Sequence, residues 1–99
     1  MLKIKYRSKK LQKICTNYSV AKKIHGEKMA ELIHLRIDQI QAAQSIEMLV
    51  KHQIGRCHPL KGDRVDEYAM DLIHPFRLVF RSYDEMDQVI LIITIEDYH

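Results

Sequence analysis

Three side chains capable of acid–base chemistry follow one another at the end of the sequence: Asp97, Tyr98 and His99. They come directly after the apolar run 89–95, which has the pattern of a strand buried in a sheet. A buried strand fixes the position of its own end. We therefore expect the carboxylate, the phenol and the imidazole to be held close together just beyond that strand. Chain ends are often disordered and a terminal histidine can be a cloning remnant, but a remnant does not normally follow a buried strand without a spacer.

A second segment, 57–64, supplies another imidazole and two cations at a predicted turn. Its sequence is Cys-His-Pro-Leu-Lys-Gly-Asp-Arg, in which His58 precedes a proline and Lys61 precedes a glycine. A further cation, Arg77, lies on the polar face of a later predicted strand. Each residue alone has a structural explanation. His58 could simply end a strand, Lys61 could be a solvated turn cation, and Arg77 could belong to the solvated face of its strand. Together, two imidazoles and a set of cations indicate chemistry on a phosphodiester.

RNA is a phosphodiester that such side chains can cleave without a metal ion. Its 2′-hydroxyl is an internal nucleophile next to the phosphorus. The protein therefore needs only to remove that proton, protonate the leaving 5′-oxygen and neutralise charge on the phosphoryl oxygens. Imidazole has an ordinary pKa of about 6.5 and can take either proton-transfer role near neutral pH.

Positive charge is concentrated in the first part of the chain. The whole sequence has a net charge of +3, but residues 1–28 contain nine Lys and Arg against a single acidic residue, a net charge of +8. Such a segment is typical of a surface that binds a polyanion, although charge runs also occur on faces that only meet solvent. The lysines that we expect to contact RNA are Lys9, Lys10, Lys13, Lys22 and Lys23.

Length and composition indicate one globular domain, 1–99, in the cytoplasm. The apolar run 89–95 is too short to cross a membrane, and no apolar segment of a signal peptide follows the N-terminal lysines. Cys15 and Cys57 are predicted to stay reduced. We predict no metal ion or other cofactor, because the sequence has neither a C-x-x-C nor an H-x-x-x-H pair.

The N-terminal half has the patterns of one strand followed by helices. The predicted elements are a strand over 2–6, a helix from its cap Ser8 to Thr16, a second helical stretch capped by Ser19, a long helical run over 27–43, and a last turn over 46–50 capped by Ser45. Gly26 either breaks or only weakens the helix in which it lies.

The C-terminal half has the alternating patterns of strands. Strands are predicted over 56–58, 68–73, 76–81 and 89–95, joined by turns or loops at 59–63, 74–75 and 82–88. The last strand is apolar on both faces, as expected for a central strand. The predicted fold is a two-layer α+β domain with an N-terminal strand, two helices and then an antiparallel β-meander, the helices covering one face of the sheet.

Three motifs in sequence order resemble a known family. They are the segment 57–64, the segment 74–80 with the sequence His-Pro-Phe-Arg-Leu-Val-Phe, and the terminal Glu-Asp-Tyr-His of 96–99. In these motifs, in length and in element order the chain resembles the killer toxins called HigB (host inhibition of growth). HigB toxins belong to the RelE/ParE superfamily of type II toxin–antitoxin systems.

The resemblance implies a small ribosome-dependent endoribonuclease. Such a toxin would enter the vacant A site of the ribosome, cut mRNA at the codon there and so inhibit translation. A HigA-like helix-turn-helix antitoxin from the neighbouring gene would neutralise it, and operator DNA would be contacted only through that antitoxin.

The resemblance also implies a set of site residues: His58, Lys61, Arg77, Asp97, Tyr98 and His99. The two histidines would act as acid and base, and the sequence leaves open which is the base. The arginine and the lysine would bind the phosphate as a planar fork and a point charge. The aspartate would orient an imidazole, and the tyrosine would stack on a base or bond to phosphate.

The sequence departs from the family pattern just after the segment 57–64. Asp66 takes the place of a glycine that the family often has, and Glu67 lies beside it. Two extra carboxylates near the proposed cleft are expected to repel RNA. One alternative is therefore a module that binds nucleic acid or antitoxin without catalysis. A second, because the same superfamily includes such toxins, is a DNA gyrase poison with the same fold, against which the paired histidines argue.

Overall fold

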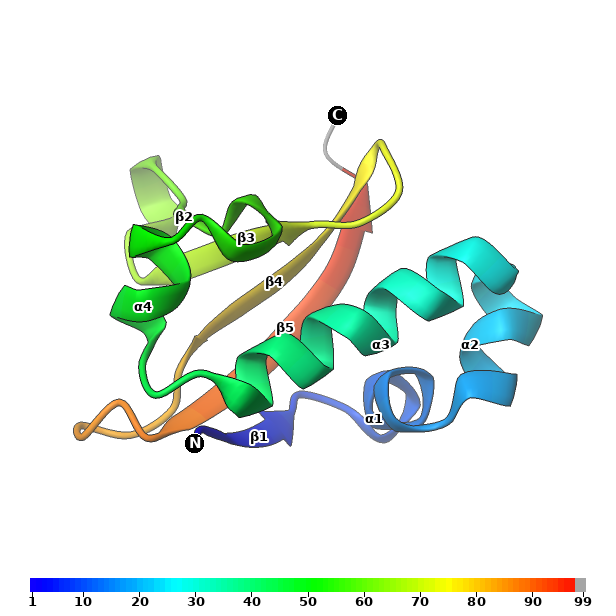
Figure 1. Cartoon of the computed structure of the whole chain (residues 1–99), viewed down its shortest axis with the longest axis horizontal. Coiled ribbons are helices and arrows are strands. Elements are labelled where there is room, and N and C mark those ends of the chain that lie inside the picture. The colour runs from blue at the N-terminus through cyan, green and yellow to red at the C-terminus, as the bar shows by residue number, and fades with distance from the viewer. Residues whose placement is uncertain (98–99) are drawn as a thin grey trace.

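A mixed five-stranded sheet forms one layer of the computed structural model, which describes residues 1–97 (Figure 1). The strands are β1 (Lys3–Tyr6), β2 (His58–Pro59), β3 (Glu67–Asp71), β4 (Phe76–Ser82) and β5 (Val89–Asp97), in the spatial order β1-β5-β4-β3-β2. β1 pairs in parallel with β5, and the other neighbours are antiparallel. The strand predicted to be central from its apolar residues, β5, does lie between β1 and β4.

Helices form the second layer. They are α1 (Lys9–Thr16), α2 (Tyr18–His25), α3 (Glu27–Ala42) and α4 (Ile46–Lys51), and two short 3₁₀ segments follow, η1 (Ile54–Arg56) and η2 (Gly62–Arg64). Gly26, with a φ of 90°, ends α2 and separates it from α3, so this glycine breaks the helix rather than only weakening it. Tertiary contact with the sheet, rather than propensity alone, stabilises helices this short.

Two of the three predicted helix caps are confirmed. The hydroxyl of Ser8 accepts from the backbone N–H of Leu11 at 3.1 Å, and Ser45 caps α4 in the same way. The prediction for Ser19 is wrong, because Asn17 caps α2 by accepting from the N–H of Val20. Asn and Ser are equally good caps, and the apolar spacing could not distinguish start points two residues apart.

The hydrophobic core lies between the helices and one face of the sheet. Its fully buried side chains include Ile33 and Ile40 of α3, Leu78 and Phe80 of β4, and Ile90 and Ile92 of β5. The opposite face has only a small apolar cluster of Leu60, Ala69, Val79 and Ile93. Leu78 and Phe80 thus pack toward the helices and Val79 lies on the other face, as the predicted alternation of β4 requires.

The two cysteines are buried and unpaired, as predicted for reduced thiols. Burial raises the pKa of both Cys15 and Cys57 to about 12, so neither is a reactive thiolate near neutral pH. Within residues 1–97, no helix is long and apolar enough to span a membrane.

Candidate active site

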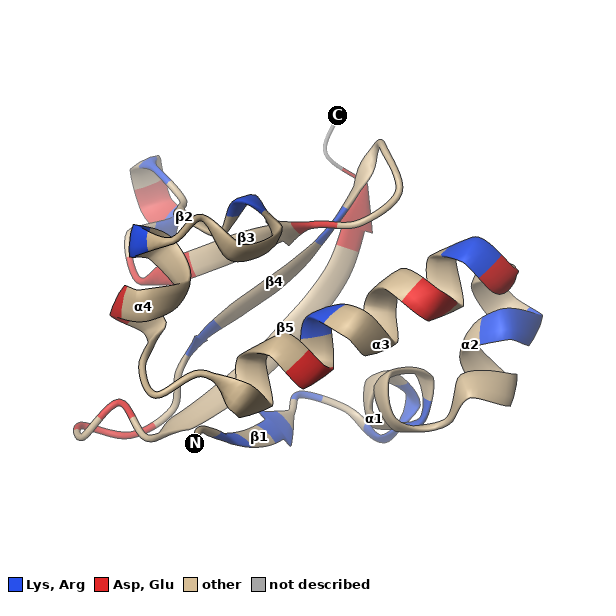
Figure 2. Ribbon diagram, in the orientation of Figure 1, with Lys and Arg blue, Asp and Glu red and all other residues tan. Residues whose placement is uncertain are grey.

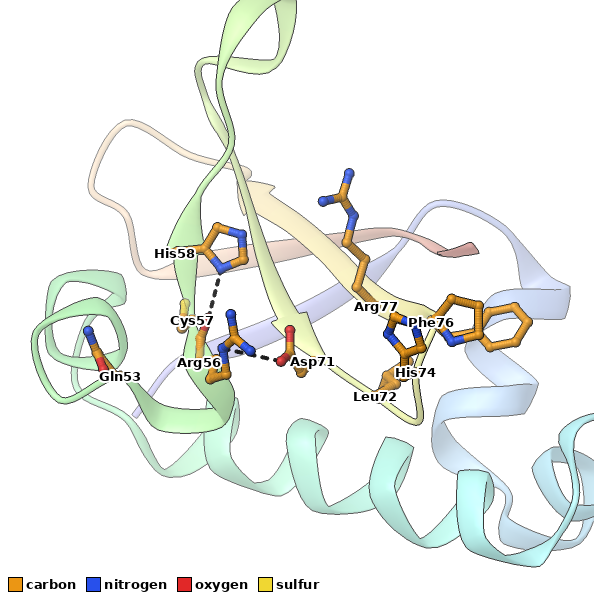
Figure 3. Close-up of a pocket in the computed structure, with 10 residues that line it drawn as sticks. Gln53, Arg56, Cys57, His58, Asp71, Leu72, His74, Phe76 and Arg77 are labelled. Atoms are coloured by element: carbon orange, nitrogen blue, oxygen red, sulfur yellow. Dashed lines mark hydrogen bonds and ion pairs between the residues drawn. The ribbon is translucent and has the colours of Figure 1, made fainter. Parts of the chain in front are cut away.

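A cavity of about 520 Å³ lies at the end of the sheet where β2, β3 and β4 meet (Figure 3). Its described lining consists of Gln53, Arg56, Cys57, His58, Asp71, Leu72, His74, Pro75, Phe76 and Arg77. Two arginines and two imidazoles therefore surround a space that is open to solvent, with one carboxylate among the described lining residues. This composition suits an anionic ligand.

His58 and Arg77, both predicted from the sequence, are brought together by strand register. His58 pairs with Ala69 on β3, and Ala69 pairs with Val79 on β4. Paired residues point to the same face of a sheet, and so do residues two apart on one strand. His58 therefore lies on the open face with Val79 and Arg77.

A hydrogen bond fixes the ring of His58. Its Nδ1 is 2.8 Å from the carbonyl oxygen of Arg56. A carbonyl can only accept, so Nδ1 carries the proton in this bond. In the neutral ring Nε2 is then the nitrogen with a lone pair, and a lone pair on a half-buried imidazole can accept a proton from a substrate.

Arg77 is held by a carboxylate on the neighbouring strand. Its Nε and Nη2 donate to Oε2 of Glu96 at 3.0 and 2.7 Å. Arg64 approaches Glu96 from η2, with Nη1 and Nη2 donating to the two carboxylate oxygens at 2.8 and 2.9 Å. Nε of Arg64 donates at 2.7 Å to Glu67, so two arginines and two glutamates form one network.

The network shifts the pKa of two of its members, Glu96 and Arg64. Hydrogen bonds from Arg64 are the main reason why the pKa of Glu96 is below its ordinary value of 4.5, with a smaller contribution from Arg77 and an opposing one from burial. Hydrogen bonds to Glu96 and Glu67 raise the pKa of Arg64. The Arg77 side chain, only 14% exposed, is thus held in one orientation by groups that stay charged at neutral pH.

Replacing Glu96 with Gln should lower the free energy of unfolding at neutral pH. It should also make that free energy fall less steeply as the pH becomes acidic. The depressed pKa of Glu96 means that its contribution is present above about pH 4.5 and is lost as the pH falls through the lower folded value. We expect a loss of about 1–2 kcal/mol at pH 7, since the network is partly exposed and solvent weakens it. Urea unfolding between about pH 3 and pH 7 measures both effects.

The control for this prediction is Glu85→Gln, which removes an exposed carboxylate in the loop after β4. It should leave the acid dependence of the unfolding free energy unchanged. A Glu96→Gln protein with the wild-type pH dependence would show that the network contributes nothing to stability.

The other predicted site residues are less closely associated with the cavity. Lys61 is exposed at the start of η2 and is not among the described lining residues. Asp97 ends β5 in register with Phe76, which does line the cavity. Tyr98 and His99 lie outside the described residues.

Two expectations about carboxylates are corrected by the structure. Glu67 is paired with Arg64 and so adds no unbalanced negative charge. Asp66 lines a different cavity, of about 390 Å³, together with Arg81. Among the described residues neither carboxylate lines the 520 Å³ cavity, so the predicted repulsion of RNA has no source there.

Several residues in or beside the cavity received no role from the sequence. The sequence motifs indicate no role for Arg56 or Glu96, include Arg64 only as one of the cations of segment 57–64, and place His74 only in a turn. Arg64 and Glu96 did lie within the motifs 57–64 and 96–99, but their contact joins residues 32 apart and depends on strand register. Among residues 1–97, no three His, Cys, Asp or Glu side chains are placed so that they could hold a metal ion.

The predicted RNA-contacting lysines lie on α1 and α2, where Figure 2 draws Lys and Arg in blue. All five are exposed. The end of α2 reaches the cavity, because the ring of His25 packs edge-on against Phe76 with centroids 6.4 Å apart. Burial and, to a smaller degree, the charge of Lys10 lower the pKa of His25. The end of α2, one of the two basic helices, therefore borders the rim formed by Phe76.

Solved structures with the same fold are toxins of the YoeB and ParE type. The YoeB/ParE toxin from Agrobacterium tumefaciens matches with a TM-score of 0.66 and 18% identity, over 99% of this chain and 100% of that one. The YoeB–YefM complex from Staphylococcus aureus matches with a TM-score of 0.64 and 22% identity, over 100% and 98%. The YoeB dimer from Staphylococcus aureus matches with a TM-score of 0.64 and 23% identity, over 99% of this chain and 97% of that one.

This similarity confirms the predicted RelE/ParE-like α+β fold, and at these identities it shows the fold alone. Comparison of the sequence with protein-family models and with curated proteins found no match. The HigB subtype stays a prediction from the three sequence motifs.

Proposed function

We propose that this chain is the toxin of a type II toxin–antitoxin system and that it cleaves mRNA on the ribosome. The observation that carries the proposal is the pairing of His58, with Nε2 left as an acceptor, and Arg77 on one wall of an open cavity. The fold shared with YoeB toxins supports it.

In the proposed reaction the RNA supplies its own nucleophile. The 2′-oxygen loses its proton to a base and forms a bond to phosphorus, while the bond from phosphorus to the 5′-oxygen breaks and that oxygen receives a proton from an acid. The products are a 2′,3′-cyclic phosphate and a 5′-hydroxyl. His58 and His99 are the proposed acid–base pair, and the geometry of Nε2 favours His58 as the base.

Cations provide the remaining chemistry. Arg77 would stabilise charge on the phosphoryl oxygens, held in place by Glu96. Lys61 would add a point charge from the exposed end of η2. Asp97 would orient an imidazole and Tyr98 would contact a base or a phosphate.

The proposed partners are the ribosomal A site, mRNA and a HigA-like helix-turn-helix antitoxin. One matching structure is itself a complex of YoeB with YefM, which supports an antitoxin partner in general. Operator DNA would be bound only through the antitoxin, and the proposed compartment is the cytoplasm.

Inducible expression followed by mapping of mRNA 5′ ends tests the function. We expect new ends within translated codons, carrying 5′-hydroxyl groups, with matching 2′,3′-cyclic phosphates upstream. A chain with both His58 and His99 replaced by Ala is the control and should produce none. Double-strand DNA breaks without mRNA cutting would instead identify a gyrase poison. If neither DNA breaks nor mRNA cutting occurred, the function would be that of a binding module.

A further inference from the structure

The turn that precedes His58 has an unusual backbone. Gln53, Gly55 and Arg56 have φ values of 49°, 58° and 54°, in the left-handed region. Non-glycine residues adopt this conformation only when the surrounding structure holds them there, and such residues occur often at functional sites. Gln53 and Arg56 both line the 520 Å³ cavity.

The conformation of Arg56 has a direct effect on His58. It aims the Arg56 carbonyl at Nδ1 of the imidazole, at 2.8 Å. The guanidinium of the same residue lies over the carboxylate of Asp71, with Nε 3.4 Å from Oδ2, so this residue is joined to both β2 and β3 (Figure 3). The position of one carbonyl in this turn therefore decides which nitrogen of His58 carries the proton.

A side chain from the helical layer supports the turn from below. Arg36 of α3 donates from Nε to the backbone carbonyl of Asp71 at 2.7 Å and from Nη1 to Gln39 at 3.0 Å. It also fills the space beneath Gly55, where an added Cβ would lie 2.7 Å from Arg36 Nε and 2.9 Å from Cδ. A larger residue at position 55 would therefore have to displace the Arg36 side chain, in addition to bearing the strain of the positive φ.

We propose that Arg36 and Gly55 are positioning residues that seat this turn on β3 and thereby hold His58 in its Nδ1–H form. Free histidine favours the Nε2–H tautomer, which would present a proton instead of a lone pair to the substrate. The catalytic consequence rests on the function proposed above, but the tautomer itself is a property of the protein alone and can be measured without RNA.

Nitrogen-15 NMR of the purified protein at about pH 9, where imidazole is neutral, reports the tautomer directly. We expect His58 to be mainly Nδ1–H in the wild type. Gly55→Ala and Arg36→Ala should each shift the ratio of tautomers toward Nε2–H by about fivefold, the equivalent of one hydrogen bond. The control is Gly26→Ala, at a glycine whose φ of 90° is also positive but where no atom lies within 4 Å of the added Cβ.

The outcomes separate this inference from the proposed function. Amide spectra identify folded variants, and Arg36→Ala decides the question if Gly55→Ala does not fold. An Nε2–H tautomer in the wild type, or an unchanged ratio in every folded variant, would overturn the inference. On programmed ribosomes, kcat should fall in parallel with the Nδ1–H fraction while KM stays constant. Tautomer shifts in a chain that never cuts RNA would uphold the positioning role and reject the nuclease.

Discussion

Replacing His58 with alanine should slow mRNA cleavage on programmed ribosomes by about 10²–10⁴-fold, the usual contribution of a general acid or base. The imidazole is half-buried and its Nδ1 is committed to the Arg56 carbonyl, so Nε2 is the nitrogen that would exchange a proton with the RNA. Single-turnover rates are the appropriate measurement, because they isolate the chemical step from product release.

His52→Ala is a suitable control for this variant. His52 is exposed at the end of α4 and is not among the described residues that line the cavity. It should cut RNA at the wild-type rate, and both variants should bind ribosomes normally. Cleavage by His58→Ala within a fewfold of the wild-type rate would remove His58 from the mechanism and direct attention to His74, the other described imidazole in the cavity wall.

The sheet was largely predictable because its strands carry strong patterns. The alternation within β4 and the two apolar faces of β5 indicate one buried face and one central position, and the structure has both. Short-range signals were less decisive. The predicted strand over 56–58 is instead His58–Pro59, because Arg56 belongs to a 3₁₀ turn with a left-handed backbone that its residue type does not indicate.

The site was predictable only in part, for a related reason. The motifs that contain His58 and Arg77 are local, so they can be recognised by their residue types. The groups that hold these two side chains come from distant parts of the chain, as when Arg36 reaches the carbonyl of Asp71, 35 residues away. Neither composition nor periodicity encodes such a contact, because it depends on how α3 packs against the sheet.

Neutralising the five lysines of α1 and α2 should weaken ribosome binding strongly and make it less sensitive to salt. These residues, Lys9, Lys10, Lys13, Lys22 and Lys23, are all exposed. If each contacts one phosphate of ribosomal RNA, replacing all five by Gln makes the salt slope of log K shallower by about 3.5–4.5. When the salt concentration rises fourfold, the wild type should therefore lose about 10²–10³-fold more affinity than the variant does.

The salt slope is more informative than the affinity alone, because a misfolded variant also binds weakly. The matched control replaces the same five lysines by Arg, which keeps every charge and should keep both the slope and the affinity. Cleavage of RNA already bound on the ribosome should be nearly unaffected in the Gln variant, since none of the five lysines is among the described residues that line the cavity. An unchanged slope would show that these helices meet solvent rather than RNA, and ribosome binding would then have to come from the cations around the cavity.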